Sequence, residues 1–192
     1  MAERAVGYDP GSRSPKAVVL ERRGERWAVL DVRLDAEASV PKGPTWACLP
    51  SQLLTLREIR HPLTDADKIA QTIRYEAEPY LSMTLEQCVL QYRVLGEHEG
   101  GSQVLLMAVP KEKLATSLEA WKALDLDPAA VPADVSALWN CYAALGEEGE
   151  APVMLLDLGA RKTLLLLFEG GKLRLMRVLR GGLEPPPEGD AA

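Results

Sequence analysis

One pattern occurs near both ends of this chain of 192 residues and limits its fold more than any other feature. In each copy an apolar run ends in Asp-x-Gly, a short loop follows, and a glycine turn separates two further apolar runs. The loops span residues 9–16 and 157–163. Aspartate and glycine favour turns between strands, so each copy predicts three sequential strands.

The middle of the chain predicts three helices. Thr64 or Asp65 caps the first, whose apolar residues recur at helical spacing as far as Tyr80. The second follows Pro110, and the third starts at Asp134, with Gly146 placed to end it. Further strands are expected at residues 45–49, 53–59, 88–94 and 103–109, so the pattern indicates an α/β fold.

Composition excludes several classes of protein. With 47% hydrophobic and 26% charged residues the chain can bury a core, and its net charge of −6 argues against a nucleic-acid surface. Its three cysteines are widely spaced, which supports neither a disulfide framework nor a zinc site. The apolar runs of the chain, such as residues 104–109 and 164–168, are far shorter than the roughly 20 residues of a membrane helix. We therefore expect a cytoplasmic protein that does not insert into a membrane.

The two Asp-x-Gly loops are the candidates for ligand chemistry. Glycine in such a turn lets backbone N–H groups point at an oxyanion, while an aspartate can hold a metal ion or its waters. The alternative is that each loop is only a hairpin turn. We assign no catalytic residue, because two histidines without a serine or cysteine in an elbow motif do not indicate nucleophilic chemistry.

Six segments together resemble a known family, the type IV pilus assembly protein PilM, a branch of the actin-like ATPase superfamily. The cytoplasmic part of type II secretion protein L is a near neighbour with the same fold. The segments occur in the order found in the PilM family, and they span residues 6–18, 73–81, 89–92, 105–111, 157–163 and 180–182.

The resemblance implies an α/β fold with an actin-like (ribonuclease H-like) lobe, a small strand-helix-strand insert and the beginning of a second lobe. The first lobe would comprise residues 1–48 and 110–150, and the insert residues 49–109. The second lobe would start at residues 151–182, followed by a disordered tail at residues 183–192, which contains three consecutive prolines. The family is nearly twice as long, which implies either a partial chain or a degenerate paralogue.

The resemblance also implies a nucleotide site, with ATP and magnesium held between two phosphate loops. The first loop would use Asp9, Gly11, Ser12 and Lys16, and the second Asp157, Gly159 and Thr163, with Asp9 and Asp157 toward the metal. Pro15 removes a backbone donor from the first loop. We therefore expect ATP binding to be weak or vestigial.

The function implied by the resemblance is that of a scaffold in a type IV pilus or type II secretion platform at the inner membrane. Such a protein docks the cytoplasmic tail of a bitopic membrane partner, here in a groove between insert and core, and contacts other platform components. Three alternatives stay open: a kinase or ATPase of the superfamily, a type II secretion protein L domain without nucleotide, and an unrelated α/β domain. The actin-like readings require the strands around Asp9 and Asp157 to lie in separate sheets.

Overall fold

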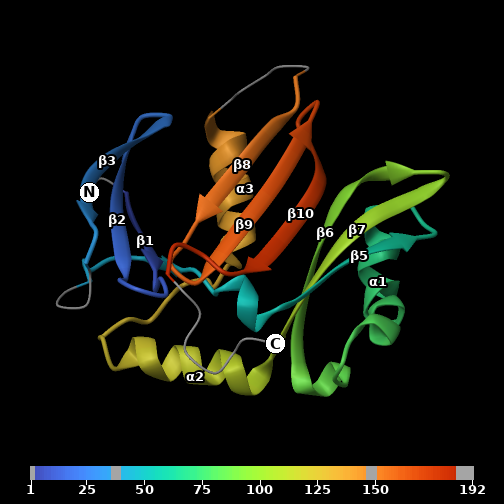
Figure 1. The fold of residues 1–192 in the computed structure, drawn as a ribbon, viewed down its shortest axis with the longest axis horizontal. Helices are drawn as coiled ribbons and strands as arrows, with labels where there is room; N and C mark the ends of the chain where they lie inside the picture. The colour runs from blue at the N-terminus through green and yellow to red at the C-terminus, as the bar shows by residue number, and fades with distance from the viewer. Residues whose placement is uncertain (1–2, 36–39, 146–150, 185–192) are drawn as a thin grey trace.

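The structure is a computed structural model that describes residues 3–35, 40–145 and 151–184. Three sheets and three α-helices make up this described part (Figure 1). The sheet nearest the N-terminus and the one nearest the C-terminus each contain one Asp-x-Gly loop, and the third sheet belongs to the middle of the chain. The α/β prediction is therefore confirmed.

The first sheet has the strand order β3-β2-β1-β4. Strands β1 (Arg4–Asp9), β2 (Lys16–Arg23) and β3 (Arg26–Arg33) are antiparallel, whereas β4 (Thr45–Ala47) is parallel to β1. Because side chains alternate along a strand, Val6 and Tyr8 share one buried face. Tyr8 belongs to a core that includes Trp121 of helix α2 (Lys111–Lys122).

The middle sheet has the order β5-β7-β6 and is fully antiparallel. Its strands are β5 (Thr55–His61), β6 (Cys88–His98) and β7 (Gly101–Pro110). Helix α1 (Ala66–Ala77) is capped by Asp65, whose carboxylate accepts the Lys68 N–H at 3.0 Å. The buried face of α1 packs on this sheet through Ile69, Ile73 and Ala77.

The last sheet has the order β10-β9-β8 and is also antiparallel, with strands β8 (Val153–Leu158), β9 (Lys162–Glu169) and β10 (Lys172–Arg180). Helix α3 (Asp134–Leu145) lies across it (Figure 1). Phe168 of β9 stacks on Tyr142 with ring centroids 4.0 Å apart and meets Trp139 edge-on at 5.9 Å. This aromatic cluster fixes α3 on the sheet.

Local departures from the sequence predictions have simple causes. Helix α1 ends at Ala77, and Tyr80 lies in the separate 3-10 turn η2 (Glu78–Tyr80), because Pro79 cannot continue the hydrogen-bonded helix. Tyr80 is consequently exposed and not part of the predicted apolar face. The fifth strand starts late because residues 51–53 form another 3-10 turn, η1 (Ser51–Leu53).

The first two residues of the predicted disordered tail make backbone hydrogen bonds. Leu183 and Glu184 donate their backbone N–H groups to the carbonyl oxygens of Gly159 and Ala160 at 3.0 and 2.9 Å. The prediction was therefore wrong for these two residues. Gly146 and residues 185–192 lie outside the described residues.

Candidate functional site

The two Asp-x-Gly loops belong to different sheets, as the actin-like prediction requires: Asp9 ends β1 and Asp157 lies near the end of β8. They are close enough for their charges to interact. Burial raises the pKa of Asp157 above its ordinary value, the Asp9 carboxylate raises it further, and Lys16 acts in the opposite direction. The structure thus brings together three of the residues predicted to hold phosphate and metal.

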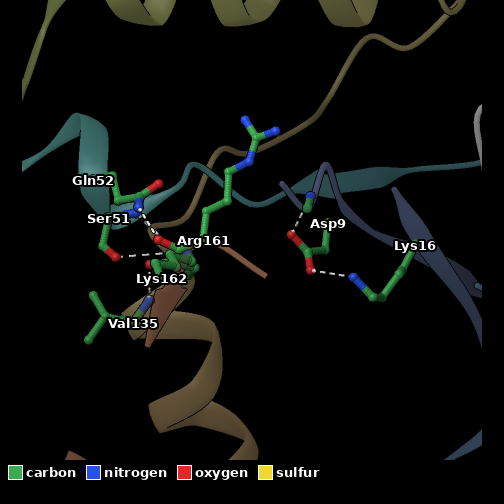
Figure 2. Close-up of polar contacts among 9 residues, drawn as sticks. Asp9, Lys16, Ser51, Gln52, Val135, Arg161 and Lys162 are labelled. Atoms are coloured by element: carbon green, nitrogen blue, oxygen red, sulfur yellow. Dashed lines mark hydrogen bonds and ion pairs between the residues drawn. The ribbon is translucent and has the colours of Figure 1, made fainter. Parts of the chain in front are cut away.

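The first loop is organised around Asp9 (Figure 2). Its carboxylate accepts the Gly11 N–H at 3.0 Å and lies 3.8 Å from the Lys16 ammonium, which also donates to the Ser14 carbonyl at 3.2 Å. Gly11 has φ +52, and a Cβ there would lie 2.3 Å from the Ser14 oxygen. Only glycine fits this turn without strain. Ser12 is exposed on the same loop.

The second loop directs its polar groups inward. The Gly159 N–H donates to the Lys162 carbonyl at 2.9 Å, and the buried Thr163 hydroxyl donates to the Gly181 carbonyl at 3.0 Å. The segment after β10 packs tightly here, since a Cβ on Gly182 would lie 2.1 Å from the Gly159 oxygen. The hydroxyl of Thr163, which the sequence predicts to bind phosphate, thus holds the chain that follows β10.

One carboxylate bridges the two loops. Glu184 lies 3.7 Å from the Arg13 guanidinium in the first loop and 3.7 Å from that of Arg161 in the second. Both arginines are largely exposed, so these ion pairs add little stability. They do show that cationic side chains of both loops reach a single anionic group.

Sequence reasoning missed a polar cluster beside the second loop. The Asp134 carboxylate pairs with the Lys162 ammonium and accepts the Ser51 N–H at 3.0 Å and the Val135 N–H at 2.6 Å (Figure 2). Both charged side chains are largely buried, exposing 13% and 16% of their surface. Asp134 was predicted as a helix cap, but no local pattern points to a lysine across the fold.

Cys48 lies in the same region and is not a candidate nucleophile. Burial raises the pKa of its thiol to about 11, with the Asp9 charge adding to the shift and Lys162 opposing it. Burial likewise lowers the pKa of Lys162, while Asp9 and Cys48 raise it. A thiol with so high a pKa stays protonated at neutral pH and is therefore a poor nucleophile.

The donor set fits a magnesium-bound phosphate only in part. Asp9 and Asp157 supply two carboxylates and Lys16 a cation, a combination that suits a metal shared with phosphate. Thr163 and the Gly159 N–H are engaged within the protein. The described residues contain no cluster of three or more His, Cys, Asp or Glu side chains suited to a metal ion.

A separate cavity of about 480 Å³ lies between the middle sheet and the core under the first sheet. Its walls come from β4, β6, β7, the start of α2 and the segment before α3. Most of the lining side chains are apolar, with Gln91 and Ser136 among the polar ones. Trp46 of β4 lines it and is 42% exposed. The cavity is therefore an apolar site open at one side.

No helix among the described residues is both long and apolar enough to span a bilayer. No protein-family model matches the chain, and no curated protein matches it.

Solved structures do match. A chain of the PilM-PilN type IV pilus biogenesis complex aligns with a TM-score of 0.72 and 25% identity, over 92% of this chain and 61% of that one. The cytoplasmic domain of EpsL, an inner-membrane component of the type II secretion system of Vibrio cholerae, aligns with a TM-score of 0.55 and 13% identity. This alignment covers 93% of this chain and 71% of the EpsL domain. A Bacteroides thetaiotaomicron protein with an actin-like ATPase fold and unknown function aligns with a TM-score of 0.52 and 11% identity, over 94% of this chain and 71% of that one.

The chain thus spans about three fifths of the matched chain in the PilM-PilN complex. The two more distant matches establish the fold, in which two hairpin sheets each present an Asp-x-Gly loop. With the match to the pilus complex, they confirm the resemblance seen in the sequence: the chain has the actin-like fold and resembles PilM.

Proposed function

We propose that the chain is a cytoplasmic scaffold of a type IV pilus or type II secretion platform, held at the inner membrane through its partners. In this role it docks the cytoplasmic tail of a bitopic membrane protein. The observation that supports the proposal best is the apolar cavity between the middle sheet and the core. A solved relative is a complex of PilM with PilN, which agrees with such a role.

The cavity suits an extended peptide with apolar side chains. Its volume of about 480 Å³ accommodates a few such side chains, and Leu114, Val89 and Met107 offer them apolar contacts. Strand β6, which supplies Val89 and Gln91, is the outer strand of its sheet. An extended segment beside it can add backbone hydrogen bonds to the side-chain contacts.

Two tryptophans of similar exposure provide a matched test. Trp46 lines the cavity, whereas Trp27 lies on β3, outside the cavity lining; they are 42% and 46% exposed. A labelled peptide from the cytoplasmic tail of the bitopic protein encoded beside this chain should bind in a fluorescence titration. Trp46→Ala should weaken binding roughly 30-fold, as expected for an anchoring aromatic residue, and Trp27→Ala less than about twofold. Equal effects of both variants, or no binding to the wild type, would contradict the proposal.

A second candidate function is weak binding of Mg-ATP, supported by the proximity of Asp9, Asp157 and Lys16. Asp9 and Asp157 would hold the metal and its waters, and Lys16, Gly11 and Ser12 would face the phosphates. The bound metal would neutralise phosphate charge. Calorimetry with Mg-ATP should show heat that Asp9→Ala abolishes and Thr163→Val leaves in place. If the wild type shows no heat of Mg-ATP binding, this second function is excluded and only the scaffold function remains.

A further inference from the structure

Strand β6 carries an arginine on the face that lines the apolar cavity. Side chains alternate along a strand, so Arg93 shares a face with Val89 and Gln91, which line the cavity. The register agrees, since Arg93 lies opposite Leu105 of β7, just as Val89 lies opposite Val109. At about 3.3 Å per residue, Arg93 is about 7 Å beyond Gln91 along the strand. It therefore extends the line of cavity residues on β6 toward helix α3.

The guanidinium of Arg93 is held in one position by α3. Its central carbon lies 3.7 Å from the ring centroid of Trp139, and one of its N–H groups donates to the side-chain oxygen of Asn140 at 3.2 Å. Trp139 is itself buried and meets Phe168 edge-on. The cation–π contact and the hydrogen bond restrict a long side chain that would otherwise be free to rotate. The cost of ordering it arises on folding and not on binding.

The positive charge of Arg93 has no carboxylate partner within the described residues. No ion pair found there includes it, and its acceptor is the neutral amide of Asn140. Burial lowers the pKa of Arg93, but a guanidinium stays charged at neutral pH. Arg93 is thus a fixed, half-buried cation beside the cavity, with N–H donors left for a ligand.

We propose that Arg93 binds a carboxylate of the peptide that docks in the cavity, so that the partner's tail carries an aspartate or glutamate close to its apolar anchors. The inference rests on the proposed docking of that tail. A guanidinium suits a carboxylate because two parallel N–H groups meet its two oxygens. An extended tail beside β6 has the same rise per residue as the strand. The acidic residue therefore lies about two positions from the residue beside Gln91 and about four from the residue beside Val89.

This contact would select among apolar tails. None of the described residues that line the cavity is charged, so apolar contacts alone accept many hydrophobic sequences. They also leave the register of an extended peptide weakly fixed, because a shift by two residues presents the same face again. One fixed cation at the end of the cavity favours the register that brings an acid to Arg93, and it disfavours tails with lysine or arginine there.

The test is a double-mutant cycle with the full 192-residue chain and the labelled peptide from the tail of the bitopic protein encoded beside it. Each acidic residue of the peptide is replaced in turn by its amide. The control is Arg57→Gln, which removes one positive charge from β5, the opposite edge strand of the same sheet. We expect Arg93→Gln to weaken binding of the unchanged peptide about tenfold, and Arg57→Gln less than about twofold. Replacing one particular acid should cause a similar loss with the wild type and almost none with Arg93→Gln.

The cycle separates a direct contact from a structural role of Arg93. If Arg93 only fixed β6 on α3, Arg93→Gln would weaken every peptide by the same factor. That result overturns the proposal, and so does a tail that binds although it has no acidic residue. Should Arg93→Gln unfold, Arg93→Lys replaces it in the cycle, because lysine lacks the planar fork. A wild type that binds no tail contradicts the docking itself. Binding that Trp46→Ala weakens and Arg93→Gln does not contradicts only the carboxylate contact.

Discussion

The two Asp-x-Gly loops have the same register but different chemistry. In the first, the position opposite the aspartate is Lys16, whose ammonium stays at the loop and is about half exposed. In the second, that position is Leu164, which is fully buried. Position 12 is serine in the first loop, and its equivalent in the second is Ala160. The first hairpin thus keeps an exposed ammonium and an exposed hydroxyl at these positions, whereas the second has a buried leucine and an alanine there.

The second loop also contains a lysine, Lys162, and this lysine has a structural role. Lys162 reaches Asp134 at the start of α3, and the same carboxylate holds Ser51. The cluster therefore ties together the last sheet, α3 and the segment after β4. Stability measurements can test this contrast between an exposed first loop and a second loop held by a buried ion pair.

The largest effect is expected for the buried ion pair. Lys162→Met leaves the Asp134 carboxylate buried without its partner, which should cost about 3–5 kcal/mol of unfolding free energy. Lys16→Met, at the exposed pair of the first loop, should cost less than about 1 kcal/mol. Urea denaturation followed by circular dichroism measures both. Equal losses would show that the two lysines have the same role.

The double variant Asp134→Asn with Lys162→Met sharpens this prediction. It removes both charges, so it should be less destabilised than the sum of the two single variants. Strict additivity would mean that the two side chains do not interact in solution.

A smaller effect is expected at the glycine of the first loop. Gly11→Ala combines a φ of +52 with a Cβ 2.3 Å from the Ser14 oxygen, and should cost about 2–3 kcal/mol. The matched control is Gly24→Ala, at a position with φ +66 and open space where the Cβ would lie. This substitution should lower the free energy of unfolding by about 1 kcal/mol. The same denaturation experiment compares them. If Gly11→Ala were as stable as Gly24→Ala, the first loop would have to adopt another backbone conformation that accepts the added Cβ.

Local patterns made most of the fold predictable, and long-range contacts account for what was missed. Asp65 caps a helix through a residue three positions away, and such signals are complete in the sequence. Asp134 meets Lys162 across 28 residues and Ser51 across 83, distances at which no periodicity gives information. The same holds for Thr163 of β9, whose hydroxyl donates to the carbonyl of Gly181, a residue that follows the next strand, β10.

A pH-dependent effect on stability is expected for Asp157. Because its pKa is raised in the folded state, ionised Asp157 costs stability above that pKa, and the cost disappears as the pH falls below the ordinary value of an aspartate. Asp157→Asn should therefore be more stable than wild type at pH 7 and equal to it near pH 3. Thermal unfolding across this pH range measures the difference. A variant that is less stable at pH 7 would show that the Asp157 charge is favourable.

The smallest stability effect is expected for Glu184, whose carboxylate lies 3.7 Å from each of two largely exposed guanidinium groups, those of Arg13 and Arg161. Glu184→Gln should change the unfolding free energy by less than about 1 kcal/mol, and salt should reduce the difference further. Glu97→Gln, at an exposed position on β6, is the control for loss of one negative charge. If Mg-ATP binds at the loops, Glu184→Gln should strengthen its binding, because the carboxylate no longer competes with phosphate for the two arginines. An unchanged affinity would mean that the two arginines do not face the nucleotide.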